Sequence, residues 1–332
     1  MRVPHFAMRP LVAVTLVSLA LGGCSSSESS APSEFNPEGA TADLAATQGA
    51  FQSPSVEAYA AVSGDISLVM NGAAAVSASA QLVTKAGANP ERYVRALAGI
   101  LPRASGGISA AVAAIPSGAL GKTYVWDEVN GVYVASDLTG APSNGVRFVL
   151  YAVNPVTLRP VEPVIEVGYV DLIDQSGTTT GSFRAIVVSG GVTYLDYTVS
   201  ASGTENSGTV TISGFVTDGE TTATFNLENV ITNGASGLVI TLDYDIDVPS
   251  RDLELDYTAT LSGFLTETFA VDVNFIMKGS NGWVVLEGSY GNTGGTFTVT
   301  VNGDLFATIT LAAGGELTVT GADGQPLSEV EE

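Results

Sequence analysis

The alternation of apolar and polar residues changes character near residue 120. From Gly121 to Thr320, valine, threonine, tyrosine and phenylalanine alternate with polar residues, and turn-forming residues recur about every ten positions, as in antiparallel strands joined by short turns. Residues 53–118 are instead rich in alanine, with apolar residues spaced as on helices. The sequence predicts an α+β fold, in which an N-terminal alanine-rich helical segment packs on a long, curved antiparallel β-meander shaped as a half-barrel or a barrel.

Residue pairs that end in proline mark the starts of the predicted helices. Ser53 before Pro54 and Asn89 before Pro90 each combine a capping residue with a first-turn proline. The apolar positions that follow are a looser stripe from Ile66 to Ala80 after the first pair, and Val94, Leu97, Ala98 and Leu101 after the second. Residues 108–115 fit either a helix or a buried extended piece.

Turn residues predict which positions lie opposite each other in several hairpins. One hairpin is expected around Asn130-Gly131. The other turns and pairs are Asp218-Gly219 with Val216 opposite Thr221, the three-residue loop Asn302-Gly303-Asp304 with Val301 opposite Leu305 and Val299 opposite Ala307, and Pro249-Ser250 with Ile246 opposite Leu253. In each case these registers gather apolar side chains on one face.

The last of these hairpins carries the sharpest chemical feature of the sequence. Its register places carboxylates opposite one another in three pairs, which are Asp243 with Asp256, Asp245 with Glu254, and Asp247 with Asp252. Like charges that face each other destabilise a sheet, and Ca²⁺ would offset them because it binds several carboxylate oxygens. Two interpretations stay open: a weak calcium site, or a solvated acidic face that keeps a β-rich protein from stacking on its neighbours.

The first 23 residues form a secretory signal segment. Arg2 and Arg9 precede an apolar run that is too short to span a bilayer, and small residues follow it. The sequence Leu21-Gly22-Gly23-Cys24 resembles the lipobox of bacterial lipoproteins. The resemblance implies cleavage before Cys24, acylation of that residue and an extracytoplasmic position with membrane contact through the acyl anchor alone. Ser25 resembles the outer-membrane-directed pattern of Gram-negative lipoproteins.

Residues 24–52 are predicted to be a flexible tether rich in serine and alanine. Its 28 residues after Cys24 would span roughly 30 Å, which holds the body off the membrane without orienting it. The helical segment 53–118 and an antiparallel β domain, 119–325, then pack together as one body.

Composition excludes several classes of function. The chain carries 12 basic and 34 acidic residues, a net charge of −22, so it lacks the basic patch that nucleic-acid binding requires. Its one histidine, His5, lies in the signal segment. The mature chain therefore has no histidine for a catalytic triad or a zinc site, and no resident cofactor is expected. We expect a protein that is not an enzyme.

Three functions remain open on the sequence. The first is a non-enzymatic structural or binding module of the bacterial envelope, with another envelope protein as partner. The second is a carrier of lipid or another apolar ligand in a half-barrel cavity. The third is a glycoside hydrolase that uses only carboxylates, or a carbohydrate-binding module. The residues considered for the third are Trp126, Trp283, the pair Glu162 and Glu166, and the pair Asp171 and Asp174.

Overall fold

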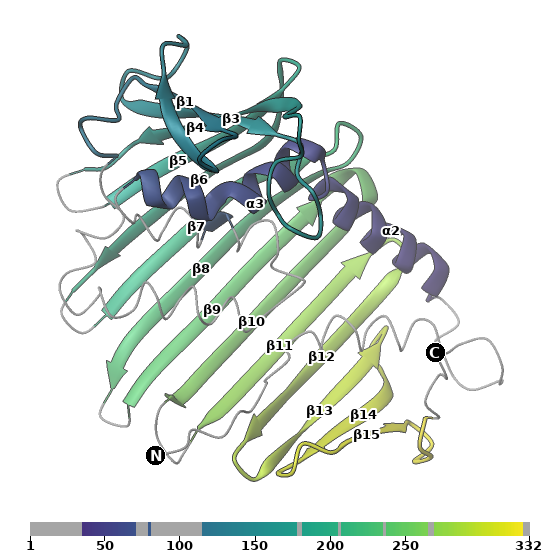
Figure 1. The fold of residues 1–332 in the computed structure, drawn as a ribbon. Helices are drawn as coiled ribbons and strands as arrows, with labels where there is room; N and C mark the ends of the chain where they lie inside the picture. The colour runs from purple at the N-terminus through teal and green to yellow at the C-terminus, as the bar shows by residue number, and fades with distance from the viewer. Residues whose placement is uncertain are drawn as a thin grey trace. The chain divides into compact units, whose positions relative to one another are not determined.

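The computed structural model describes residues 35–70, 79–80, 115–177, 181–204, 207–234, 237–264 and 269–327. Within these ranges the protein is mostly β with a small helical part, which agrees with the predicted α+β class (Figure 1). The described residues divide into two compact units: unit 1 contains residues 48–222, and unit 2 contains residues 35–47 and 223–327. In the pairings that these residues form, β2 and β15 each have one neighbour, so no ring of strands is closed.

The helices and strands have the following bounds. The helices are α2 (Pro37–Ala50), α3 (Pro54–Val69) and the 3-10 turn η2 (Pro249–Arg251). The first seven strands are β1 (Thr123–Asp127), β2 (Val132–Ser136), β3 (Gly145–Tyr151), β4 (Glu166–Asp174), β5 (Gly181–Ser189), β6 (Val192–Gly203) and β7 (Ser207–Thr217). The remaining strands are β8 (Thr222–Gly234), β9 (Gly237–Val248), β10 (Leu253–Phe264), β11 (Ala270–Gly279), β12 (Gly282–Gly291), β13 (Gly294–Val301), β14 (Asp304–Ala312) and β15 (Leu317–Gly321).

Unit 1 consists of α3 packed on a sheet with the order β2-β1-β3-β4-β5-β6-β7. Neighbouring strands are antiparallel except β1 and β3, which pair in parallel. The fully buried side chains that α3 turns toward β2–β6 are Val56, Tyr59, Val62 and Ile66. Their spacing of three or four residues places them on one face of the helix. Burying an aliphatic side chain of this size stabilises the fold by roughly 1.5–3 kcal/mol.

The start of α3 lies where the sequence predicts it. Pro54 is the first helical residue, and the carbonyl of Ser53 accepts a hydrogen bond from the Glu57 amide at 2.9 Å. The Ser53 hydroxyl makes no capping bond and is buried with no hydrogen-bond partner. The prediction is therefore confirmed for the position of the helix start and wrong for the side-chain cap.

Three hydroxyl groups meet in the core of unit 1. The hydroxyl of Tyr197 on β6 lies 2.7 Å from that of Tyr59 on α3 and 3.2 Å from that of Ser79. All three residues are at most 2% exposed. Burial raises the pKa of Tyr197 to about 12, and it raises the pKa of Tyr59 well above its usual value, with Tyr197 adding to the effect. Both tyrosines thus stay protonated at neutral pH and tie the helix to the sheet.

Unit 2 contains a meander in which β8 to β15 are paired in sequence order and all pairs are antiparallel. Residues that lie directly opposite each other share a face of the sheet. One row of the apolar face consists of Leu227, Tyr244, Tyr257, Phe275, Leu286, Val299 and Ala307. One row of the polar face consists of Glu228, Asp243, Thr258, Asn274, Glu287, Thr298, Thr308 and Thr320.

The predicted register of the β13–β14 hairpin is confirmed away from its turn. Val299 lies opposite Ala307 as expected. Nearer the turn the register shifts by one residue, so that Val301 faces Asp304 instead of Leu305. The three-residue loop is therefore wrong: Asn302 (φ +50°) and Gly303 (φ +90°) form a two-residue turn, and a bulge takes up the extra residue.

The predicted register of the β9–β10 hairpin is wrong by two residues. Leu253 faces Val248, and Ile246 faces Leu255. The connection is longer than a two-residue turn because η2 follows β9 and Asp252 then adopts a left-handed conformation with φ +49°. A shift of two residues leaves every side chain on its predicted face, but it changes which carboxylates meet.

The remaining two turns lie near the positions that the sequence predicts, and one of them differs by a residue. β1 and β2 pair around Asn130-Gly131, where Gly131 has φ +64°. Between β7 and β8 the Asp218 amide donates to the Thr221 carbonyl at 3.3 Å. The turn is thus centred one residue later than the predicted Asp218-Gly219 pair, and Thr221 meets Asp218 instead of Val216.

Residues 37–50, which the sequence analysis places in a flexible tether, form helix α2. The start of this helix has the same signal as the other predicted helices, since Asn36 precedes Pro37 and its side-chain Oδ1 accepts a hydrogen bond from the Gly39 amide at 3.0 Å. The second predicted helix, residues 89–101, lies outside the described residues, as does Cys24.

Candidate functional site

The six candidate calcium ligands lie on and beside the polar face of unit 2. Asp245 faces Asp256, and Asp247 faces Glu254, so two carboxylate pairs form instead of three. Asp243 faces Thr258. Asp252 lies in the turn after η2, where no strand residue is opposite.

This geometry does not gather the carboxylates around one point. Successive residues on one face of a strand are about 7 Å apart. Each oxygen that binds Ca²⁺ must instead lie about 2.3–2.6 Å from the ion. Among the described residues, no group of three or more His, Cys, Asp or Glu could hold a metal ion. The part of the face that lies toward β11 is instead partly neutralised, since Lys278 Nζ lies 3.5 Å from Glu254 Oε2.

The electrostatic effect of the crowded carboxylates appears at Asp256. Partial burial raises the pKa of its carboxyl group, and the charges of Asp245 and Glu254 raise it further. Lys278 acts in the opposite direction. The polar face thus disfavours its own full ionisation, as expected for a solvated acidic surface.

The apolar face of unit 2 carries a small polar group where β8 pairs with β9. Asn229 and Leu242 are both buried, and the hydroxyl of Tyr244 donates to Asn229 Oδ1 at 3.0 Å. The ring of Tyr257 lies 5.9 Å from that of Tyr244, and burial raises the pKa of Tyr257. A broad apolar surface with a few hydrogen-bonding groups is the chemistry expected for contact with an apolar ligand that has a polar end.

Trp126, a candidate for stacking on a sugar, lies in an aromatic cluster of unit 1. Its ring is 5.5 Å from that of Tyr133 in an edge-on arrangement, and Tyr133 in turn lies edge-on to Phe148 at 5.3 Å. Arg159 approaches the other side of Trp126 at 5.6 Å. These contacts favour a packing role for Trp126. Trp283, on β12 of unit 2, is 45% exposed.

Of the two carboxylate pairs considered for hydrolysis, Asp171 and Asp174 do not form a common site. Asp171 forms two hydrogen bonds of 2.7 Å with Arg147, whose guanidinium group also lies 3.6 Å from the centre of the Tyr169 ring. Asp174 is three residues farther along β4 and therefore points to the other face. Glu162 and Glu166 are both exposed, one before β4 and one at its first residue.

A second ion pair of the same kind joins β5 and β6. Arg184 Nε donates to Asp196 Oδ1 at 2.7 Å, and its Nη2 contacts the other carboxylate oxygen. Bidentate pairs of this geometry hold neighbouring strands in register. Among the carboxylates of unit 1 that the sequence offers as catalytic groups, Asp171 is thus used for pairing strands.

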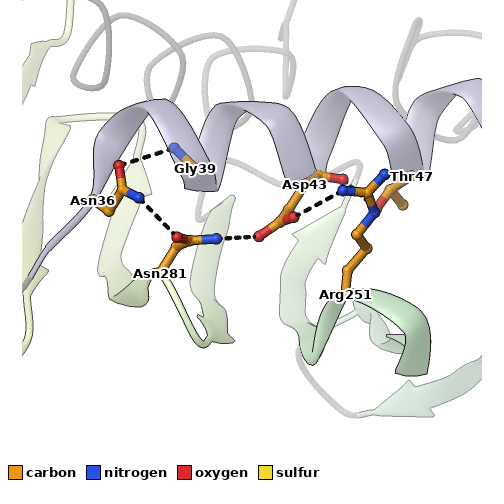
Figure 2. A network of polar contacts seen from close by, with 6 residues as sticks. All are labelled: Asn36, Gly39, Asp43, Thr47, Arg251 and Asn281. Atoms are coloured by element: carbon orange, nitrogen blue, oxygen red, sulfur yellow. Dashed lines mark hydrogen bonds and ion pairs between the residues drawn. The ribbon is translucent and has the colours of Figure 1, made fainter.

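The polar cluster that sequence reasoning missed lies where α2 meets two turns of unit 2 (Figure 2). The Asn36 amide donates to the Asn281 carbonyl at 2.9 Å, and Asn36 Nδ2 donates to Asn281 Oδ1 at 3.0 Å. Asn281 Nδ2 donates to Asp43 Oδ2 at 2.6 Å, and Arg251 Nη1 lies 3.8 Å from Asp43 Oδ1. We name these four residues the α2 clasp.

The clasp depends on a close approach of helix and turn. Asn281 lies between β11 and β12, and Arg251 belongs to η2 between β9 and β10. A Cβ atom on Gly39 would collide with the side chains of Asn281 and Asn36, so a larger residue at this point of α2 would displace members of the clasp. Asp43 is 6% exposed, and its carboxylate bridges the two turns. The Asn36-Pro37 pair is the sequence signal that predicts this helix.

No described helix is both long and apolar enough to cross a membrane. No protein-family model, curated protein or solved structure matches the chain.

Proposed function

We propose that this protein is a lipid-anchored, extracytoplasmic bacterial lipoprotein whose β-rich body is a non-enzymatic structural or binding module of the envelope. The observation that carries the proposal is the sequence Leu21-Gly22-Gly23-Cys24 after a basic and apolar signal segment. A body with many more acids than bases supports contact with the membrane through the anchor, because anionic headgroups repel it. In a Gram-negative cell, Ser25 favours the outer membrane.

The use of the charged side chains supports a body without catalysis. Arg147 with Asp171, and Arg184 with Asp196, join neighbouring strands, while Asp43 joins a helix to two turns. Groups used in this way fix a rigid scaffold. The mature sequence also contains no histidine or free thiol to supply a nucleophile or a base near neutral pH.

The anchor is tested by expressing the full-length protein with an alkyne-labelled palmitate and fractionating the cells. The wild-type protein should carry the label and sediment with membranes. A Cys24→Ser variant is the matched control, since it keeps the body and the apolar run while removing the acylated sulfur. Wild-type protein that stays unlabelled, or a Cys24→Ser variant that is labelled equally, would contradict the proposal.

A specific difference between the two units favours a second candidate, the carriage of lipid or another apolar ligand on a half-barrel surface. In unit 1 the side chains of α3 fill the inner face of the sheet, which leaves that face as core. In unit 2 the hydrogen bonds and the ion pair made by the side chains of Asn36 and Asp43 reach the turns after β9 and β11. The face around Asn229 and Tyr244 is where an apolar ligand would bind, and because Asn229 and Leu242 are already buried, the ligand would have to displace what covers them.

Two substitutions on one strand test this candidate. Ala259 is buried on the apolar face between Leu242 and Val273, and Thr258 beside it points to the polar face. If lipid binds there, mass spectrometry of wild-type protein and of Thr258→Phe should detect co-purified lipid, and Ala259→Phe should reduce it. Wild-type protein that holds no lipid would contradict carriage. Circular dichroism verifies that both variants fold.

A further inference from the structure

Because α2 is attached to unit 2, the tether between the predicted lipid anchor and the folded body is shorter than the sequence predicts. Residues 25–34 are the ten residues between Cys24 and Phe35, where the described chain begins. The Phe35 ring packs against Gly282, at the turn between β11 and β12. The chain is therefore attached to unit 2 ten residues after the predicted lipid, and not 28 residues after it.

Four contacts hold this attachment at one end of the strands. Asn36 makes two hydrogen bonds with Asn281, and Asp43 contacts both Asn281 and Arg251 (Figure 2). Because Leu253 pairs with Gly279, the β9–β10 and β11–β12 turns lie at the same end of the sheet. We call this the turn end of unit 2. The other end of β12 is marked by the turn at Asn292 and Thr293.

Two lengths decide the consequence. The sequence predicts a flexible tether before Phe35, and ten residues of such a chain would have an r.m.s. span of roughly 17 Å. The ten residues of β12 separate its two ends by roughly 30 Å. The turn end is therefore the part of unit 2 held nearest the predicted lipid, and the opposite end can lie up to roughly 30 Å farther from it.

We propose that the turn end of unit 2, formed by the β9–β10 and β11–β12 turns, faces the phospholipid headgroups of the membrane that holds the anchor. This inference depends on the proposed lipid anchor. Arg251 and Asp252 are the charged residues of the two turns, and Lys278 beside them lies 3.5 Å from Glu254 Oε2, so the surface has no excess of positive charge that would bind anionic lipid strongly. Tethering supplies the contact, and it should persist on zwitterionic membranes and at high salt.

Energy transfer from the protein to the membrane surface tests the orientation. Full-length acylated protein is reconstituted in phosphatidylcholine vesicles that contain a headgroup-labelled acceptor lipid. A fluorescent donor is attached at Ser250→Cys at the turn end, or at Thr293→Cys at the opposite end; both positions are exposed. Acylation blocks the thiol of Cys24, so each variant has one reactive cysteine. Transfer should be stronger from residue 250, with a difference in donor distance of roughly 30 Å.

A clasp variant serves as the matched control. Asp43→Ala combined with Asn281→Ala removes two side chains of the clasp but leaves the bond from the Asn36 amide to the Asn281 carbonyl, so α2 is held less firmly on the turns. The difference between the two donors should then shrink. Equal transfer from both positions in the wild-type clasp, or stronger transfer from residue 293, would overturn the orientation alone. Acylation-competent protein that does not float with the vesicles would overturn the anchor and the orientation with it.

Discussion

The buried tyrosine pair in unit 1 offers a quantitative test of how α3 is held. The hydroxyl of Tyr197 lies 2.7 Å from that of Tyr59 and 3.2 Å from that of Ser79. Replacing Tyr197 by phenylalanine removes a partner from two buried hydroxyls, which should reduce the free energy of unfolding by about 2 kcal/mol. Tyr59→Phe leaves Tyr197 bonded to Ser79, so it should cost about 1 kcal/mol.

The double variant separates this pair from two independent effects. Because either substitution removes the same bond, the loss in Tyr59→Phe with Tyr197→Phe should be about 1 kcal/mol smaller than the sum of the single losses. Urea unfolding followed by circular dichroism gives the free energies, and unchanged m-values show that the comparison is valid. Tyr194→Phe on the same strand, at a half-buried position, is the control and should cost less than about 0.5 kcal/mol. Additive losses would refute the bond.

Three further predictions follow from the same contacts. Because the pKa of Tyr197 is raised to about 12, its contribution to the free energy of unfolding should be complete below pH 10 and fall as pH rises from about 10 to 12, and Tyr197→Phe should flatten this part of the pH profile. Asp256→Asn should raise the free energy of unfolding by a few tenths of a kcal/mol, because it removes a carboxylate whose pKa is raised partly by like charges beside it. The gain should be smaller at high salt, which screens these charges. Gly39→Val should expose α2 to limited proteolysis while Gly64→Val, where a Cβ meets open space, should not.

Each of these has an outcome that would contradict it. A pH profile that is as steep in Tyr197→Phe as in the wild type would exclude that tyrosine as a contributor to it. Loss of stability in Asp256→Asn would show that its carboxylate makes a favourable contact. Equal cleavage of α2 in both glycine variants would show that the clasp does not depend on the close approach at Gly39.

The alternating pattern predicts the strands well because each strand in unit 2 has one apolar and one polar face. The apolar residues Val299 and Ala307 meet as predicted, since burial selects their register. At Asp252 the prediction fails because a left-handed residue after η2 lengthens the turn. A two-residue shift preserves both faces, so hydrophobic pattern alone cannot detect it.

Contacts between distant parts of the chain are the aspect that sequence predicts least well. Asn36 before Pro37 predicts the start of α2, but nothing local indicates that Asp43 meets Asn281, 238 residues later. The polar face illustrates the same limit. Its carboxylates are evident in the sequence, whereas the register decides that Asp243 faces Thr258 and that Asp252 lies in a turn.

Mass spectrometry of the N-terminal peptide from membrane-purified protein tests the central claim most directly. The account predicts a peptide that begins at Cys24 and carries acyl chains on its sulfur and amino group. A chain that begins at Met1, or a peptide with an unmodified Cys24 thiol, would contradict the lipid anchor and remove the basis for a membrane-facing turn end.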